Sequence, residues 1–408
     1  MAQTQRNHRD GNDNEDIRIA RLRGTIPIEC GYGRRTAEAF RSLLGAGLVT
    51  TLGAYNGQQA IQYVKAGLST VYVSGWQVAA AHNTAREIYP DQSLYPVDSM
   101  PAVIEEMVRA LRRADQIQSL EGGNVKYEVP LIADGEAGFG GPLHAYELTR
   151  RLIEAGAAAV HFEDQSPAAK KCGHLGGKVL IPTSQMIRIL RAARLASKVL
   201  STNTVVIART DAESASFIAS DIDPNDKQYI DTSLARTSEG YFHHRASLEA
   251  SIHRALAYAP HADILWFETS RPSLEEAARF ARAIHAQYPK KWLAYNCSPS
   301  FRWASNLSGN EALRTFQQDL YKLGYVFQFV TLGAYHSTNL ASFRLASEYK
   351  KEGMLAYSKL QELELSVSPA YTGARHQTEA GVTYFDAIGQ LLGETTNAFG
   401  GSTEQSQF

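Results

Sequence analysis

Acidic side chains follow several short apolar runs in this chain of 408 residues. Asp134 and Glu136 stand at the end of one run, Glu163 ends the next, and Asp91 lies in a polar segment before them. Carboxylates that meet at one place repel one another unless a cation lies between them. Oxygen donors suit Mg²⁺, with Mn²⁺ as a second candidate, far better than zinc. We therefore predict a divalent-metal site made by these four carboxylates.

Other polar groups end further apolar runs. Arg209 ends one of them, and an arginine of this kind binds a carboxylate through two hydrogen bonds. Any one such residue could be a turn or capping residue, but so many consecutive runs with polar ends favour an active site. Beside a hard cation, this set predicts a small substrate that carries two or three carboxylates. The remaining members are Ser74, Gly75, Trp76, Glu268, Asn296, Ser298, Ser300 and Thr331.

A basic, glycine-rich segment, Lys170–Lys178, has the composition of a mobile lid. Cys172 lies in it beside Lys170, Lys171 and His174. Positive neighbours lower the pKa of a thiol, so Cys172 is expected to act as an acid or a base near neutral pH. The alternative is an inert cysteine in a surface loop.

The elements that must position these residues repeat along the chain. Eight short runs are apolar and rich in β-branched residues, as expected of parallel strands that are covered on both faces, and helical patterns lie between them. This order predicts an α/β fold, a (β/α)₈ TIM-type barrel, whose active site lies at the carboxyl ends of the strands. The eight runs are Leu48–Ala54, Thr70–Gly75, Val129–Gly135, Ala159–Asp164, Thr204–Asp211, Ile264–Thr269, Trp292–Ser298 and Tyr325–Leu332.

The rest of the chain predicts additions to the barrel. Residues 1–16 are polar and are expected to form a disordered tail, which leaves residues 17–408 as one catalytic domain with extra helical segments at both ends. The long connections 76–127 and 211–260 are expected to hold extra helices or functional insertions. A helical extension from about residue 335 exceeds one closing helix and suggests packing against another subunit.

The bulk composition excludes several classes of protein. Hydrophobic residues make up 44%, charged residues 20%, and the net charge is −1, which favours neither nucleic acid nor an anionic membrane as a partner. Three cysteines do not form a disulfide framework. No secretory signal and no apolar run long enough to cross a bilayer is evident, so a cytoplasmic location is expected. The pair His243-His244 is expected in a solvated loop.

The lid segment resembles the signature of the isocitrate lyase family, which reads K-K-C-G-H followed by Leu or Met. The resemblance extends from about Leu22 to the end of the chain, and its combination of motifs is highly specific. The matching segments are Ser74–Val78, Tyr89–Pro96, Ala133–Gly141, His161–Gln165, Lys170–Leu175, Ile207–Asp211, Trp266–Thr269, Tyr295–Phe301 and Gly401–Phe408.

The resemblance implies a Mg²⁺-dependent retro-aldol cleavage of isocitrate into glyoxylate and succinate, a reaction of the glyoxylate cycle. Asp134 would bind the metal directly, and Asp91, Glu136 and Glu163 would hold its waters. Cys172 would protonate the product carbanion. The group that accepts the hydroxyl proton is left open, with Glu268, a metal-bound hydroxide and a tyrosine as candidates. The glyoxylate half would be held by Ser74, Gly75, Trp76 and Arg209; the succinate half by Asn296, Ser298, Ser300 and Thr331, with Gly173 and His174 on the lid.

The same resemblance implies a homotetramer in which neighbouring subunits exchange a C-terminal helix. The chain departs from the family pattern at Ile17–Gly45, Ala79–Glu87 and Gly333–His336, which are segments outside the predicted catalytic set.

Two alternatives remain open. The first is 2-methylisocitrate lyase, whose substrate carries one extra methyl group, worth only about 1–3 kcal/mol of discrimination. Lys171 and the chain length favour isocitrate. The second is a non-catalytic binding protein on the same barrel, which the complete set of acids, arginine and cysteine opposes.

Overall fold

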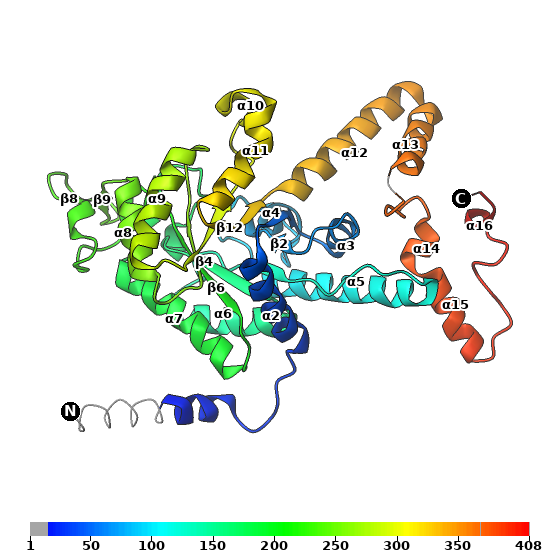
Figure 1. The fold of residues 1–408 in the computed structure, drawn as a ribbon, viewed down its shortest axis with the longest axis horizontal. Helices are drawn as coiled ribbons and strands as arrows, with labels where there is room; N and C mark the ends of the chain where they lie inside the picture. The colour runs from blue at the N-terminus through cyan, green and yellow to red at the C-terminus, as the bar shows by residue number, and fades with distance from the viewer. Residues whose placement is uncertain (1–14, 368, 408) are drawn as a thin grey trace.

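A closed barrel of eight parallel strands forms the centre of the protein (Figure 1). The computed structural model describes residues 15–367 and 369–407. Every strand of the barrel lies within one of the eight apolar runs, so the predicted (β/α)₈ fold is confirmed. In the order in which they pair around the barrel, the strands are β1 (Val49–Ala54), β12 (Tyr325–Val330), β11 (Trp292–Asn296), β10 (Ile264–Phe267), β6 (Val205–Thr210), β4 (Ala159–Glu163), β3 (Leu131–Asp134) and β2 (Val71–Val73).

Helices surround the barrel and bury the outer faces of its strands. Gly156 ends one of these helices, α6, with a positive φ of 119°, as expected of a glycine C-terminal cap. The surrounding helices are α3 (Gly57–Lys65), α4 (Gly75–Ala81), α5 (Ser99–Glu121), α6 (Pro142–Ala155), α7 (Thr183–Val199), α8 (Leu248–Tyr258), α9 (Leu274–Gln287), α10 (Trp303–Asn306) and α11 (Gly309–Lys322).

The interior of the barrel is packed with aromatic side chains. The ring of Phe329 stacks on Tyr72 at 4.6 Å between centroids and meets the edge of Trp266 at 5.1 Å. Helix α2 (Gly31–Ala46) contributes Phe40 to the same core, 5.3 Å from Phe327. The barrel is therefore a filled core and not a pore, and its polar groups gather at one end.

The two long connections contain secondary structure, as predicted. The first holds α4 and α5. The second contributes three strands to a small sheet of order β5-β7-β9-β8, made by β5 (Val179–Leu180), β7 (Phe217–Ile218), β9 (Phe242–His244) and β8 (Ile230–Asp231), and then α8. The expectation of a solvated loop for His243-His244 is wrong, because both lie in β9 and His244 is buried, with Nδ1 3.0 Å from Ala215 O.

The C-terminal extension leaves the barrel through α12 (Gly333–Glu352), which projects away from it (Figure 1). Of the residues of this long helix only Ala334 is buried. Beyond α13 (Met354–Ser366) the chain returns through α14 (His376–Ala380) and α15 (Val382–Leu391), which packs on α5, and ends in α16 (Thr403–Gln407).

At the other end of the chain, residues 15–23 form a helix, and the rest of the expected tail lies outside the described residues. No helix in the described part of the chain is long and apolar enough to span a membrane.

Candidate active site

The side chains named from the sequence meet around one cavity at the carboxyl end of the barrel. Of the predicted site residues only Gly75, Glu136 and Glu163 do not line it, and these three contact residues that do. The volume of the cavity is about 50 Å³, well below the roughly 300 Å³ at which small-molecule sites begin. The lining residues are Tyr72, Ser74, Trp76, Asp91, Asp134, Cys172, Gly173, His174, Arg209, Glu268, Asn296, Ser298, Pro299, Ser300, Thr331 and Leu332.

Asp134, at the end of β3, is held by backbone donors on both oxygens. Gly75 N donates to Oδ2 at 2.9 Å and Glu136 N donates to Oδ1 at 2.9 Å. Glu136 adopts a positive φ of 54°, a strained backbone for a non-glycine residue that turns the chain back over the strand end. A Cβ atom at Gly75 would lie 2.5 Å from Glu136 Oε1, so only glycine lets α4 begin this close to the acids.

The other acids meet around the ammonium of Lys170. Lys170 Nζ contacts Asp91 Oδ1 and Glu136 Oε2, and lies 3.7 Å from Glu163 Oε1. Burial raises the pKa of Glu136, and neighbouring Asp91 and Asp134 raise it further despite Lys170. Burial likewise raises the pKa of Glu163 well above its ordinary value, although Arg209 and Lys170 oppose the shift. Around Lys170 the carboxylates outnumber the ammonium three to one, and Arg209, which also contacts Glu163, is itself paired with Asp211.

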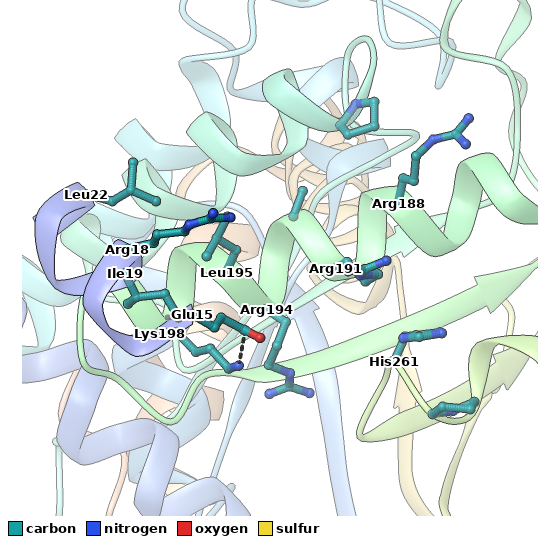
Figure 2. Close-up of a pocket in the computed structure, with 13 residues that line it drawn as sticks. Glu15, Arg18, Ile19, Leu22, Arg188, Arg191, Arg194, Leu195, Lys198 and His261 are labelled. Carbon is teal, nitrogen blue, oxygen red and sulfur yellow. Dashed lines mark hydrogen bonds and ion pairs between the residues drawn. The ribbon is translucent and has the colours of Figure 1, made fainter. Parts of the chain in front are cut away.

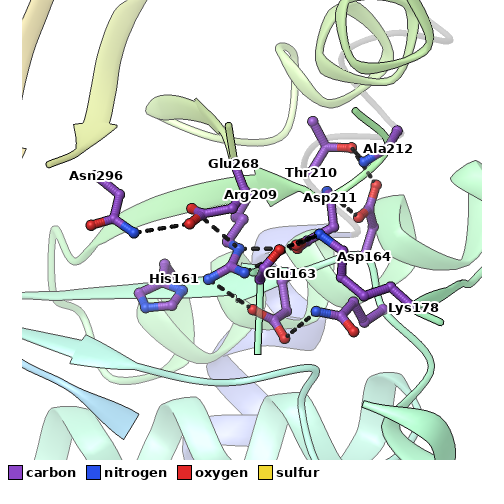
Figure 3. Close-up of polar contacts among 12 residues, drawn as sticks. His161, Glu163, Asp164, Lys178, Arg209, Thr210, Asp211, Ala212, Glu268 and Asn296 are labelled. Atoms are coloured by element: carbon purple, nitrogen blue, oxygen red, sulfur yellow. Dashed lines mark hydrogen bonds and ion pairs between the residues drawn. The ribbon is translucent and has the colours of Figure 1, made fainter. Parts of the chain in front are cut away.

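Arg209, near the end of β6, is fixed from several sides (Figure 3). Asp211 binds it bidentately, with Nε–Oδ2 and Nη2–Oδ1 distances of 3.0 Å. Glu163 Oε2 lies 3.2 Å from Nη1, and the guanidinium stacks 4.7 Å above the ring of Trp266. This arrangement presents a preorganised cation to the cavity.

Polar groups with unused hydrogen-bonding capacity come from β10 and β11. Asn296 Nδ2 donates to Glu268 Oε1 at 2.9 Å. In the described part of the chain, the buried atoms Glu268 Oε2 and Asn296 Oδ1 make no hydrogen bond. A buried polar atom without a partner is costly, so these two atoms point to a bound ligand or water. Ser298 Oγ accepts a hydrogen bond from Ser300 N at 3.1 Å.

The lid segment lies over the cavity. Gln165 holds it through Nε2 to Lys171 O at 2.8 Å and through Oε1 from Lys171 N at 3.0 Å. His174 Nε2 lies 3.4 Å from Glu268 Oε1. Because a cavity of about 50 Å³ holds only a few waters, the lid is closed here and must move to admit a small-molecule substrate.

Cys172 does not have the acidity that its basic neighbours suggested. Burial is the largest effect and, together with Asp91, raises the pKa of the thiol to about 12. Lys170 and Arg209 lower it by less, because their charges are shared with surrounding carboxylates. The prediction of a lowered pKa is therefore wrong. A protonated thiol at the edge of the cavity is suited to donate a proton and not to accept one.

The acids of β3 and β4 fit a divalent cation held partly through water. In residues 15–367 and 369–407 no three His, Cys, Asp or Glu side chains are arranged to grip an ion directly. The carboxylates of Asp91, Glu136 and Glu163 outnumber the cations beside them, and a divalent cation would relieve this excess of negative charge. Asp91 and Asp134 both line the cavity, but Asp91 is paired with Lys170, so Asp134 is the acid expected to contact the metal directly. Mg²⁺ commonly keeps several of its waters.

Several residues of the site were not identified from the sequence. His161 Nε2 is 2.8 Å from Tyr72 OH and 3.2 Å from Asp134 Oδ1 beneath the cavity. Lys170 neutralises the acids, and Lys178 binds both the lid and Asp211. Both lysines stand in the lid segment, but their acidic partners are far away in sequence, so spacing alone could not reveal them.

A second hollow lies away from the barrel end, between residues 15–23 and α7 (Figure 2). It measures about 570 Å³ and is rimmed by basic side chains, two of which are already paired: Lys198 with Glu15 at 3.1 Å and Arg194 with Asp263 at 2.6 Å. Among residues 15–367 and 369–407, no Cys, Ser, Thr, Tyr or Asn lines it. The catalytic chemistry is therefore assigned to the barrel end.

A family model and curated relatives match nearly the whole chain. The model described as the isocitrate lyase family matches residues 3–234 and 228–408. The isocitrate lyase of Halalkalibacterium halodurans is 53% identical over 396 residues, which cover 96% of this chain and 92% of that protein. The isocitrate lyase of Escherichia coli K12 is 50% identical over 406 residues, and isocitrate lyase 1 of Mycobacterium tuberculosis is 47% identical over 396.

Solved structures share the fold at low sequence identity. A 2,3-dimethylmalate lyase matches with a TM-score of 0.61 and 22% identity, covering 90% of this chain and 98% of its own. A phosphoenolpyruvate phosphomutase from Streptomyces platensis matches with a TM-score of 0.62 and 19% identity, covering 88% and 99%. These likenesses support the barrel and say nothing further about the substrate.

Proposed function

The chain belongs to the isocitrate lyase family, and from this premise we propose that it is a carbon–carbon lyase that cleaves isocitrate into glyoxylate and succinate in the glyoxylate cycle. The observation that carries the proposal is the single cavity in which Cys172, Arg209 and Asp134 meet hydroxyl and amide groups from other strands. Arg209 offers a cation for one carboxylate of the substrate, and Cys172 offers a proton donor. The hydroxyl and amide groups offer hydrogen-bond donors for a second carboxylate.

The proposed metal is Mg²⁺, with Mn²⁺ as an alternative. Asp134 would be its direct ligand, and Asp91, Glu136 and Glu163 would hold its waters. When bound, the metal polarises the C2 hydroxyl and the adjacent carboxylate of the substrate and so lowers the free energy of the alkoxide.

The two halves of the substrate would be held by different walls of the cavity. Arg209 would bind the carboxylate of the glyoxylate half bidentately, since its orientation is already fixed by Asp211. Ser74, Gly75 and Trp76 would complete that side at the start of α4. The charge that develops on the succinate half would be stabilised by hydroxyl and amide donors, supplied by Asn296, Ser298, Ser300 and Thr331, with Gly173 and His174 covering it from the lid.

Two proton transfers balance the reaction. Glu268 would accept the C2 hydroxyl proton through Oε2, its oxygen without a hydrogen bond. The C2–C3 bond then breaks, its electron pair stays on C3, and the C2 oxygen becomes the aldehyde oxygen of glyoxylate. The Cys172 thiol would donate its proton to C3 to give succinate, and the proton on Glu268 returns to the thiolate through solvent after product release.

The test is a coupled assay of glyoxylate release from isocitrate, with and without Mg²⁺. Turnover that depends on the metal supports the proposal, and the absence of turnover with either Mg²⁺ or Mn²⁺ contradicts it. Parallel assays with 2-methylisocitrate decide the alternative substrate: a higher kcat/KM for that compound would overturn the choice of isocitrate.

We also propose that the protein is a homotetramer that exchanges C-terminal helices between subunits. Helix α12 supports this, because a long helix with one buried residue leaves its apolar side chains without a partner in the single chain. The cytoplasmic location stays a prediction from the sequence.

A further inference from the structure

Lys178 is a buried lysine at the end of the lid segment, and the proposed chemistry gives it no role. Its ammonium donates to Gly173 O at 2.6 Å, to Asp211 Oδ1 at 2.9 Å and to Ser214 Oγ at 2.8 Å. Lys178 has no solvent-exposed surface. A buried ammonium is tolerated only when its donors are satisfied, and three acceptors match the three donors that a lysine carries.

One of these acceptors connects Lys178 to the substrate-binding arginine (Figure 3). Asp211 accepts from Lys178 through Oδ1 while it binds Arg209 through both oxygens. Burial alone would raise the pKa of Asp211, but Arg209 and Lys178 together hold it well below its usual range. Asp211 therefore stays ionised and transmits the position of the ammonium to the guanidinium.

Another acceptor connects Lys178 to the closed lid. Gly173 lies directly on the site: a Cβ atom there would be 2.5 Å from Arg209 Nη2 and 2.8 Å from Glu268 Cγ. Gly173 O can reach Lys178 only while the lid lies in this place. Gly177 between them, with a φ of 71°, gives the backbone freedom to move, whereas Lys178 is anchored by the strand β5 that follows it.

We propose that Lys178 is a positioning residue that couples closure of the lid to the orientation of Arg209, a role that rests on the proposed function. In the closed lid all three donors of Lys178 are used, and opening leaves the donor to Gly173 without its acceptor. The closed state is thereby favoured, and in it Asp211 is held from one side by Lys178 and from the other by Arg209.

The experiment compares Lys178→Met with the wild-type protein by the rate at which iodoacetamide alkylates Cys172, followed by peptide mass spectrometry in the absence of substrate. Cys172 belongs to the lid and faces the closed cavity, so its alkylation reports lid opening. We expect the rate to rise about 10- to 100-fold, as for the loss of one charge-assisted hydrogen bond. For isocitrate, KM should rise and kcat should fall.

The matched control is Lys291→Met. Lys291 Nζ also donates to carbonyl oxygens, Ala259 O at 2.7 Å and Ala262 O at 2.6 Å, but it lies just before β11, at the opposite end of the barrel from the cavity. This variant should lose thermal stability without faster alkylation of Cys172 and without a change in KM. A similar loss of stability in Lys178→Met, with unchanged alkylation and unchanged KM, would overturn the proposal.

A milder variant keeps the test decisive if Lys178→Met does not fold. Ser214→Ala removes one of the acceptors that hold the Lys178 ammonium within reach of Gly173 O, while the ammonium stays paired with Asp211. Its bond to the closed lid should therefore weaken, and alkylation should rise by about 2- to 5-fold. An unchanged alkylation rate in this variant would contradict the proposed role of Lys178 in holding the lid closed. The alkylation measurement needs no substrate, so it tests the role of Lys178 in lid closure even if the protein has another substrate. A wild-type protein that fails to cleave isocitrate would refute only the proposed function.

Discussion

At the scale of single residues, the chemistry depends on burial as much as on residue type. The thiol of Cys172 and the carboxyl of Glu163 both have raised pKa values, and burial is the first cause in each case. The same burial makes the thiol a proton donor and makes the carboxyl a group that gains from a nearby metal ion. These two residues therefore provide the sharpest tests at this scale.

Replacing Cys172 by serine should abolish turnover while the fold is retained. A serine hydroxyl has nearly the same size, but it is a much weaker acid than the thiol, and general acid catalysis contributes about 10²- to 10⁴-fold in rate. The measurement is kcat from glyoxylate release, with thermal melting as the check on folding. Cys297→Ser is the control, because that thiol is buried outside the cavity lining. A Cys172→Ser enzyme with the wild-type rate would remove Cys172 from the mechanism.

Replacing Glu163 by glutamine should stabilise the metal-free protein at neutral pH. The folded-state pKa of Glu163 is raised, so the stability contributed by its protonated form is fully present below its ordinary pKa of 4.5 and is lost as pH rises through the folded-state value. At pH 7.5 without divalent ions, the Tm of the variant should therefore be higher than that of the wild type.

Addition of Mg²⁺ should make the Tm of the wild type higher than that of Glu163→Gln. At 100 times its Kd a ligand adds about 2.7 kcal/mol to the folded state, and the variant should gain much less because it holds the metal's waters less well. Glu147, an exposed partner of Arg150, provides the control. Glu147→Gln should leave the Tm without metal and the increase in Tm with Mg²⁺ unchanged. A lower Tm for Glu163→Gln without metal, together with the wild-type response to Mg²⁺, would contradict the assignment.

At the scale of elements, a buried ion network joins α8 to the ends of two barrel strands. Arg254 of α8 lies 3.0 Å from Asp164 Oδ2 and 2.9 Å from Asp226 Oδ1. Asp164, just after β4, in turn accepts from Asp211 N at 2.9 Å and from the Thr210 hydroxyl at 2.7 Å. The helix thus helps to position the segment that holds Arg209, although no part of α8 lines the cavity.

Replacing Arg254 by methionine should lower the free energy of unfolding by about 3–5 kcal/mol, because two buried carboxylates lose their partner. Urea denaturation measures the change. Arg279→Met is the matched control: Arg279 pairs with Glu249 on the surface, and an exposed ion pair contributes at most about 1 kcal/mol. Equal losses of unfolding free energy in the two variants would show that the buried network stabilises the fold no more than an exposed ion pair does.

At the scale of the whole molecule, the exposed apolar side chains of the C-terminal extension support the proposed tetramer. Phe343 of α12 is 72% exposed and Leu391 of α15 is 89% exposed. Large apolar patches of this kind mark interaction surfaces. Since α12 leaves the barrel at the strand that supplies Thr331 to the cavity, assembly through this helix would also stabilise one wall of the site.

Replacing Phe343 by aspartate should shift the oligomer toward smaller species. Light scattering after size exclusion is expected to give the wild type about four times the chain mass of 44.9 kDa, and the variant a lower mass, because a charge is costly in an apolar interface. Leu143→Asp, an equally exposed change on α6, should leave the mass unchanged. A wild-type protein that elutes as a monomer would refute the proposed tetramer.

The sequence by itself determined the strands and the end of the barrel at which polar groups gather. A strand that is buried on both faces needs a nearly continuous apolar run, so each of the eight runs, such as Ala159–Asp164, predicted a strand. Since parallel strands end on one face, Asp134, Arg209 and Asn296 had to converge once their runs were recognised as strands. Local composition and order were sufficient for both inferences.

Only the tertiary structure decided which groups pair and how strongly each is buried. Lys170 meets Asp91 across 79 residues of sequence, and Lys178 meets Asp211 across 33, distances over which spacing carries no information. The sequence predicted a lowered pKa for Cys172, because the adjacent lysines suggested a positive electric field at the thiol. The structure shows that this pKa is raised. In the structure the charge of Lys170 is balanced by Asp91 and Glu136, which come from other parts of the chain. Desolvation, which depends on the packed lid, is the largest effect on the pKa of Cys172.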